Sequence, residues 1–189
     1  MGLFEIIAVL FSLACVWLAV QKNVLNWPAG IVAVVAYFIV FFQVKLYADM
    51  CLQVIFFLQG IYGWYNWKKE RNETFTTVQS MTLNQWIFYG LIITVLTAFW
   101  SFVLIQFTDA NLPIIDAFVA MLSLTANWLL ARKLLENWLF WIAANSIYCV
   151  LFWYKELYLS SGIYIVFLVL AIKGYRDWKK ISVTKKDLF

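Results

Sequence analysis

The fold is decided by residues 123–180, which read SLTANWLLARKLLENWLFWIAANSIYCVLFWYKELYLSSGIYIVFLVLAIKGYRDWKK. The same stretch occurs once before, without a gap, at residues 12–69, which lie 111 positions earlier. Of the 58 aligned positions 19 are identical, and these include Trp, Tyr, Asn and Gly positions and the closing Lys-Lys pair. Shared hydrophobicity alone does not align residues of these types, so the chain contains a duplicated unit.

Composition and apolar run length predict an all-α polytopic membrane protein. Apolar residues make up 65% of the 189 residues and charged residues 13%, against about 45–50% and about 25% in soluble domains. A helix crosses the bilayer with about 20 apolar residues. Seven such stretches are expected at residues 3–20, 27–44, 46–67, 86–107, 112–131, 134–154 and 157–175.

The duplication divides these spans into three plus one plus three. Residues 1–67 form a first three-helix repeat, and residues 68–111 form a cytoplasmic linker and a linking fourth helix. A second three-helix repeat covers residues 112–180, and residues 181–189 form a cytoplasmic tail. Matching helices are four spans apart, an even number, so we expect the repeats to insert in the same orientation.

Basic residues predict the orientation in the membrane. Only Lys45 and Lys155 lie at one end of the spans, whereas the other 12 of the 14 Lys and Arg residues lie at the opposite end. The positive-inside rule places the C-terminus in the cytoplasm and the N-terminus outside. The outer end carries 2 basic and 5 acidic residues, a net charge of −3. That charge indicates either a vestibule that attracts cationic solutes or simply the scarcity of basic residues in exterior loops.

The residue types exclude several functions. The chain has no histidine, and its three cysteines lie in apolar runs, so we expect no metal site, cofactor or enzymatic activity. Short basic loops beside membrane spans indicate anchoring to lipid rather than binding of nucleic acid. No phosphate-binding loop is present, and no carboxylate lies at the middle of a span. Both absences favour uncoupled movement of a solute down its gradient.

Polar and aromatic residues within the spans are the candidate solute-binding residues. Trp138, Trp141, Asn145 and Tyr148 recur at helical spacing on one face of the sixth span. That face can stack an aromatic ring and form hydrogen bonds with hydroxyls or a carboxamide. Interfacial anchoring is the alternative for Trp138, and a packing hydrogen bond is the alternative for the amides. The further candidates are Tyr37, Gln53, Gln59, Trp64 and Asn127.

Two segments carry a resemblance to a known family. They are Tyr62-Gly63-Trp64-Tyr65-Asn66-Trp67, and Asn127-Trp128 followed by Ala131-Arg132-Lys133 and residues 136–142, ENWLFWI. With them, the chain resembles the PnuC family of vitamin transporters along nearly its whole length. The resemblance implies a plan shared with SWEET sugar transporters, a homotrimer, and a binding site mainly on the third and sixth spans.

The resemblance also implies a function. We expect facilitated diffusion of nicotinamide riboside across the bacterial inner membrane by alternating access. A cytosolic kinase then phosphorylates the solute and traps it. Thiamine, which is also aromatic and cationic, is an alternative cargo. A membrane scaffold whose repeats serve only for packing is an alternative of a different class.

Overall fold

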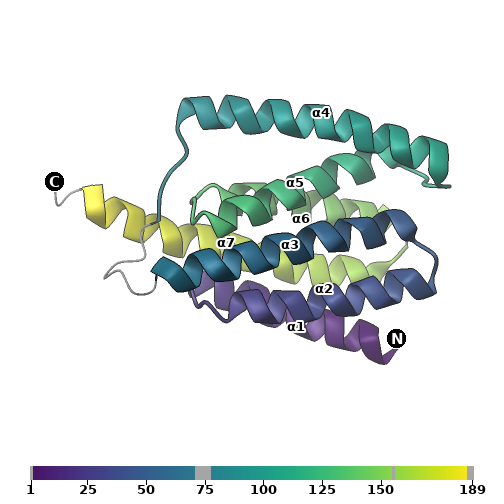
Figure 1. Cartoon of the computed structure of the whole chain (residues 1–189), viewed down its shortest axis with the longest axis horizontal. Helices are drawn as coiled ribbons and strands as arrows, with labels where there is room; N and C mark the ends of the chain where they lie inside the picture. Colours follow the sequence, from purple (N-terminus) through teal and green to yellow (C-terminus); the bar gives the residue numbers. More distant parts are fainter. Residues whose placement is uncertain (1, 71–77, 155, 187–189) are drawn as a thin grey trace.

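The computed structural model describes residues 2–70, 78–154 and 156–186, which fold into seven long α-helices (Figure 1). The helices are α1 Leu3–Val20, α2 Asn26–Gln43, α3 Tyr47–Glu70, α4 Leu83–Phe107, α5 Pro113–Ala131, α6 Asn137–Tyr154 and α7 Tyr158–Lys186. The prediction of an all-α chain with seven helices is therefore confirmed. Residues 71–77 of the predicted linker, Lys155 of the predicted outer end, and residues 187–189 of the predicted tail lie outside the described residues.

Local side-chain chemistry explains where helices start. The ring of Pro113 fixes a helical φ at the first position of α5. Helix α4 begins at Leu83, three residues earlier than predicted, because Thr82 forms a capping box with Gln85. In this box the Thr82 amide donates to Gln85 Oε1 at 2.8 Å, and the Gln85 amide donates to Thr82 Oγ1 at 3.4 Å.

Helix α6 starts three residues later than predicted because the segment before it pairs with the chain that leads into α4. The Gln79 amide donates to the Lys133 carbonyl at 3.1 Å, and the Leu135 amide donates to the Gln79 carbonyl at 2.8 Å. Together they form an isolated bridge between Gln79 and Leu134. The backbone of residues 134 and 135 is thereby held in a turn between α5 and α6.

Helix α7 is longer than predicted. The apolar run ends at Tyr175, but the helix continues to Lys186, which adds 11 residues or about 16 Å. Charged residues end the segment suited to lipid, but they are good helix formers and do not end the helix. The sequence pattern therefore located the end of the apolar segment and not the end of α7.

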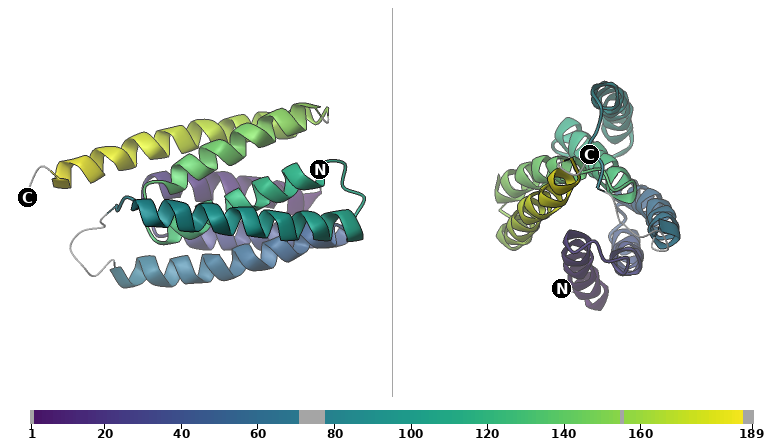
Figure 2. Two further views of the ribbon diagram at one scale, coloured as in Figure 1. Left: turned by 90° about the horizontal axis from the view of Figure 1, so that it is seen from above. Right: turned by 90° about the vertical axis from the view of Figure 1, so that its left-hand side faces the viewer.

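Six of the helices pack into a closed ring. In the order α1, α2, α3, α5, α6, α7, each helix contacts the next one. Helix α7 also contacts α1, which closes the ring. Helix α4 stands outside this ring and packs against α5 (Figures 1 and 2). Because α4 covers α5 from outside, α5 is deeply buried. In its most apolar 18-residue stretch 67% is buried, against 17% for α1.

Helix positions follow the 111-residue shift. Moving α2 by 111 residues gives the bounds of α6, and the first residue of α3 moves onto the first residue of α7. The turns agree as well, because Lys22 and Lys133 have φ values of 55° and 56°, and Lys45 and Glu156 have values of 61° and 59°. Non-glycine residues seldom adopt this left-handed conformation. The duplicated sequence therefore gives the same backbone at both of its paired turns.

Five helices within the described residues are long and apolar enough to cross a membrane. They are α1, α2, α4, α5 and α7, which leaves α3 and α6. These two helices carry most of the polar candidates of the sequence, among them Gln53, Gln59 and Asn145. Both helices are also rich in Trp and Tyr, whose side chains are amphipathic.

Candidate functional site

The candidate site is built on the face of α6 that points into the ring. Two contacts fix how α6 is rotated. On one side Trp138 packs on Gly174 of α7, and on the other side Phe140 stacks on Trp86 of α4 with ring centroids 5.6 Å apart. The helical face between these flanks turns toward the centre of the ring. We call its residues the inner stripe: Trp141, Asn145 and Tyr148.

The opposite face of α6 is suited to lipid. Val150 is 71% exposed and Trp153 is 65% exposed. Trp141, by contrast, is partly buried and packs against both clusters of buried apolar residues in the core. The polar groups of α6 are therefore directed inward and its exposed apolar groups outward.

Asn145 is the most informative member of the inner stripe. Its side chain is 4% exposed, and it forms no hydrogen bond with any residue that the structure describes. Neither of its amide atoms is among the fully enclosed polar atoms that lack a partner, so the amide keeps some accessible surface. Such a group is suited to a ligand that supplies the missing partners.

Aromatic rings surround the stripe beyond Tyr148. Tyr164 of α7 lies 4.6 Å from Tyr148 and 5.2 Å from Phe152, measured between ring centroids. Phe167 meets Tyr164 edge-on at 5.8 Å. We call Tyr148, Phe152, Tyr164 and Phe167 the aromatic cage. Its flat apolar faces suit a planar heteroaromatic solute.

The sequence did not single out Tyr164, although the repeat contained a signal. Tyr164 lies 111 residues after Gln53, which is a predicted site residue on α3. The predicted residue Tyr37 is likewise the counterpart of Tyr148. Tyr37 stacks on Phe41 at 5.8 Å and 16°, and Tyr148 stacks on Phe152 at 5.7 Å and 18°. Both halves thus contain the same stacked pair. They differ at the aligned position that is Gln53 in the first half and Tyr164 in the second.

Carboxylates lie near the cage. Asp49 of α3 and Asp116 of α5 are both within electrostatic range of the Tyr148 phenol. Tyr164 is within range of Asp49 and also of Tyr37 of α2. Residues from five helices therefore converge at this end of the ring.

Gln59 and Asn127, two further predicted residues, contact each other. The Asn127 amide donates to Gln59 Oε1 at 2.9 Å, and the Gln59 amide donates to the Leu124 carbonyl at 3.2 Å. Next to this pair, Tyr62 stacks on Trp128 at 4.9 Å. These contacts join α3 to α5, which is the role that the packing alternative assigned to the amides.

Trp138 lies in a structural cluster that occurs twice. Its ring meets Trp178 edge-on at 5.5 Å, and a Cβ added to Gly174 would lie 2.6 Å from it. The counterpart Trp27 meets Trp67 at 5.6 Å and packs on Gly63 in the same way. Trp138 is 1% exposed, so its ring faces are occupied by protein in this conformation.

The remaining candidates lie on α3. Gln53 is partly buried, whereas Trp64 is 42% exposed on the surface of the chain. The structure therefore places Trp141, Asn145 and Tyr148 on one face of α6, and Tyr164 lies within electrostatic range of both Tyr148 and Tyr37. Trp64 stays apart on the surface. Within the described ranges, no group of three or more His, Cys, Asp or Glu residues is placed to hold a metal ion.

Comparison with known proteins gives consistent matches. Residues 2–180 match a family described as nicotinamide mononucleotide transporters. The nicotinamide riboside transporter PnuC of Escherichia coli (strain K12) is 30% identical over 92% of this chain and 84% of its own length. The riboflavin/roseoflavin transporter RibM of Streptomyces davaonensis is 20% identical over 92% of this chain and 83% of its own. The crystal structure of the vitamin B3 transporter PnuC superposes with a TM-score of 0.74 and 24% identity, covering 94% of this chain and 81% of that one.

Proposed function

We propose that this chain, which belongs to the nicotinamide mononucleotide transporter family, is a membrane transporter that carries nicotinamide riboside. The name of the Escherichia coli relative supports this cargo. The observation that carries the proposal is the inner stripe, with an unpaired buried amide between two aromatic residues on the ring-facing side of α6. Nicotinamide riboside contains a positively charged aromatic ring, a carboxamide and a ribose.

Each part of the solute has a matching group. The pyridinium ring stacks on Trp141 or within the aromatic cage, where each cation–π contact contributes about 0.5–2 kcal/mol. Asn145 exchanges hydrogen bonds with the carboxamide or with a ribose hydroxyl. We propose that Tyr37 and Gln53, from the first half of the ring, also contact the solute. Trp138, Gln59, Asn127 and Trp64 stay predictions as contacts to the solute.

Charge favours the riboside over the mononucleotide. All Lys and Arg residues lie near the ends of the spans, so the centre of the ring contains no basic side chain to pair with a phosphate. Asp49 and Asp116 lie close to the cage, at the end of the spans that carries 2 basic and 5 acidic residues, and this excess of acidic residues disfavours a phosphate. We therefore assign the unphosphorylated nucleoside as the cargo.

The ring suggests how the transporter moves. We propose that α1–α3 and α5–α7 are parallel repeats, joined by α4 in a three-plus-one-plus-three arrangement like that of SWEET transporters. The two junctions between the halves, α3 with α5 and α7 with α1, are equivalent under the 111-residue shift, which supports this arrangement. Alternating access then consists of rocking one triplet against the other around the inner stripe.

The cellular setting follows from the same proposal. We place the protein in the bacterial inner membrane, with the basic end and the C-terminus in the cytoplasm. Transport is uncoupled, and a cytosolic kinase retains the solute by adding a charged phosphate. The homotrimer implied by the family resemblance belongs to this proposal.

A flavin is the second candidate cargo because RibM, which is named a riboflavin transporter, matches nearly the whole chain. Riboflavin is a larger, neutral ring system that stacks on aromatic faces but gains nothing from Asp49 and Asp116. Thiamine is cationic and does gain from them. The cargo is therefore tested with all three vitamins.

The test is uptake of labelled nicotinamide riboside into proteoliposomes that contain the purified protein and no ion gradient. The proposal expects uptake that stops when inside and outside concentrations are equal, and that unlabelled riboside inhibits more strongly than riboflavin or thiamine. A dependence on a proton or sodium gradient rejects the uncoupled mechanism. Stronger inhibition by riboflavin or thiamine rejects the assigned cargo.

A further inference from the structure

A shallow depression of about 990 Å³ runs along one face of α7 from Val169 to Lys180. Gly174 and Trp178 lie on the other side of the helix, where Trp178 is fully buried and donates its Nε1 proton to the Val20 carbonyl of α1. That buried side faces the ring. The depression therefore faces outward, toward the surroundings of the protein.

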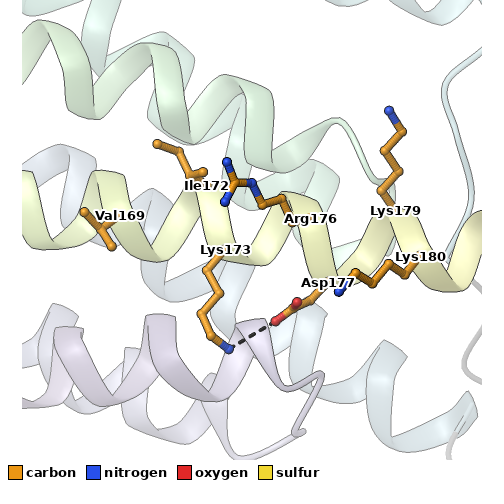
Figure 3. Close-up of a pocket in the computed structure, with 7 residues that line it drawn as sticks. All are labelled: Val169, Ile172, Lys173, Arg176, Asp177, Lys179 and Lys180. Atoms are coloured by element: carbon orange, nitrogen blue, oxygen red, sulfur yellow. Dashed lines mark hydrogen bonds and ion pairs between the residues drawn. The ribbon is translucent and has the colours of Figure 1, made fainter.

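The chemistry of the depression changes along the helix axis. Val169, which is 60% exposed, and Ile172 line the part within the apolar segment of α7. Arg176, Lys179 and Lys180 line the part beyond that segment. Figure 3 shows that Ile172 and Arg176 project from the same side of the helix. An apolar groove that becomes basic where the helix leaves the membrane has the same order of groups as a phospholipid, with acyl chain first and phosphate next.

The only carboxylate among the described lining residues is already matched by cations. Lys173 Nζ lies 3.1 Å from Asp177 Oδ2, as Figure 3 shows. Asp177 is also within electrostatic range of Lys22, and Lys173 lies 5.2 Å above the ring of Trp17. Arg176 has no hydrogen bond or ion pair with the described residues. Its planar guanidinium is therefore open to a phosphate, which it can bind through two parallel hydrogen bonds.

We propose that this face of α7 binds one anionic phospholipid, with the phosphate on Arg176 and an acyl chain along Ile172 and Val169. Basic residues where helices leave the bilayer attract anionic headgroups. The apolar part of the groove distinguishes a lipid from a free phosphate, because a free phosphate gains nothing from Val169. In the proposed topology this lipid belongs to the cytoplasmic leaflet.

The first half of the chain supplies an internal control. Under the 111-residue shift, Lys173 and Arg176 correspond to Tyr62 and Tyr65, whereas the pair Lys179 and Lys180 corresponds to Lys68 and Lys69. Both halves thus have the terminal lysines, but only α7 has the arginine. A general attraction of basic helix ends to anionic lipid acts on both helices. A lipid site that depends on Arg176 acts on α7 alone.

The experiment measures lipid retention by native mass spectrometry of the full-length protein, titrated with phosphatidylglycerol or with phosphatidylcholine of the same acyl chains. One phosphatidylglycerol per chain is expected, at an affinity about fivefold or more above that of phosphatidylcholine. Arg176→Gln lowers the phosphatidylglycerol affinity by about fivefold, the effect of one charge near the headgroups. Lys68→Gln, the matched control on α3, leaves that affinity unchanged. Glycerol 3-phosphate, a soluble phosphate, does not displace the lipid.

Three results overturn the proposal. They are equal retention of the two lipids, equal losses in the two variants, and displacement of the lipid by glycerol 3-phosphate. Because lipid retention is measured without solute, failure here leaves the uptake experiment and the proposed cargo unaffected.

Discussion

Replacing Asn145 with leucine separates a binding role from a structural one. Leucine has the same branched arrangement of side-chain heavy atoms as asparagine, so Asn145→Leu removes the amide without leaving a cavity. In this structure the amide is buried without a hydrogen-bond partner among the described residues. Removing an amide that has no hydrogen-bond partner breaks no hydrogen bond, so we expect no loss of stability.

The same change weakens solute binding. The bound solute then has a carboxamide or hydroxyl without a partner, which costs about 1–3 kcal/mol, or about 5- to 150-fold in dissociation constant. Affinity is measured by isothermal titration calorimetry in detergent, and stability by thermal unfolding of the same preparations. The expected result is a clear loss of affinity with stability equal to or above that of the parent.

Asn127→Leu is the matched control because its amide is hydrogen-bonded to Gln59. It leaves Gln59 Oε1 without that partner, so we expect stability to fall by about 1–3 kcal/mol. If Asn145→Leu loses as much stability as Asn127→Leu while nicotinamide riboside binds with parental affinity, then Asn145 is a packing residue and the reasoning about the inner stripe is refuted.

Three more predictions use the same structure. Trp141→Phe weakens riboside binding by about 2- to 30-fold and removes most of the solute-dependent fluorescence quenching. Trp153→Phe, on the outward face of α6, changes neither quantity, and equal effects of the two variants contradict the orientation of α6. Gly174→Ala places a Cβ 2.6 Å from the ring of Trp138 and lowers stability by about 1–3 kcal/mol in thermal unfolding. Gly90→Ala does not, because a Cβ added there has nothing within 4 Å; equal melting points of the two variants argue against the tryptophan cluster. Asp116→Asn lowers the preference for nicotinamide riboside over its uncharged dihydro form by about fivefold in competition binding, and an unchanged preference rejects the electrostatic role.

The helices, and the shared face of three residues on α6, could be predicted from the sequence for physical reasons. Apolar run length gives the spans because the thickness of the bilayer is fixed. The spacing of Trp141, Asn145 and Tyr148 gives a common face because a helix has 3.6 residues per turn. Whether that face meets the interior of the ring or the lipid depends on the contacts of Trp138 and Phe140. Those contacts are visible only in the folded chain.

Contacts between distant residues were not accessible in the same way. Periodicity placed Gln59 and Asn127 on their helices but gave no sign that they are each other's partners across 68 residues. Trp138 shares a face with Trp141 by spacing, yet a small shift around the helix directs it to Gly174 of α7 instead. Tyr164 lies in an apolar run typical of a lipid-facing segment, and only its alignment with Gln53 indicated a role.

The most direct test of the account is an experimental density map of the protein with bound nicotinamide riboside. The account predicts solute density inside the helix ring, in contact with Trp141 and Asn145 and next to the aromatic cage. Solute density on the outer surface of the ring, or a map in which the inner stripe faces lipid, would contradict it.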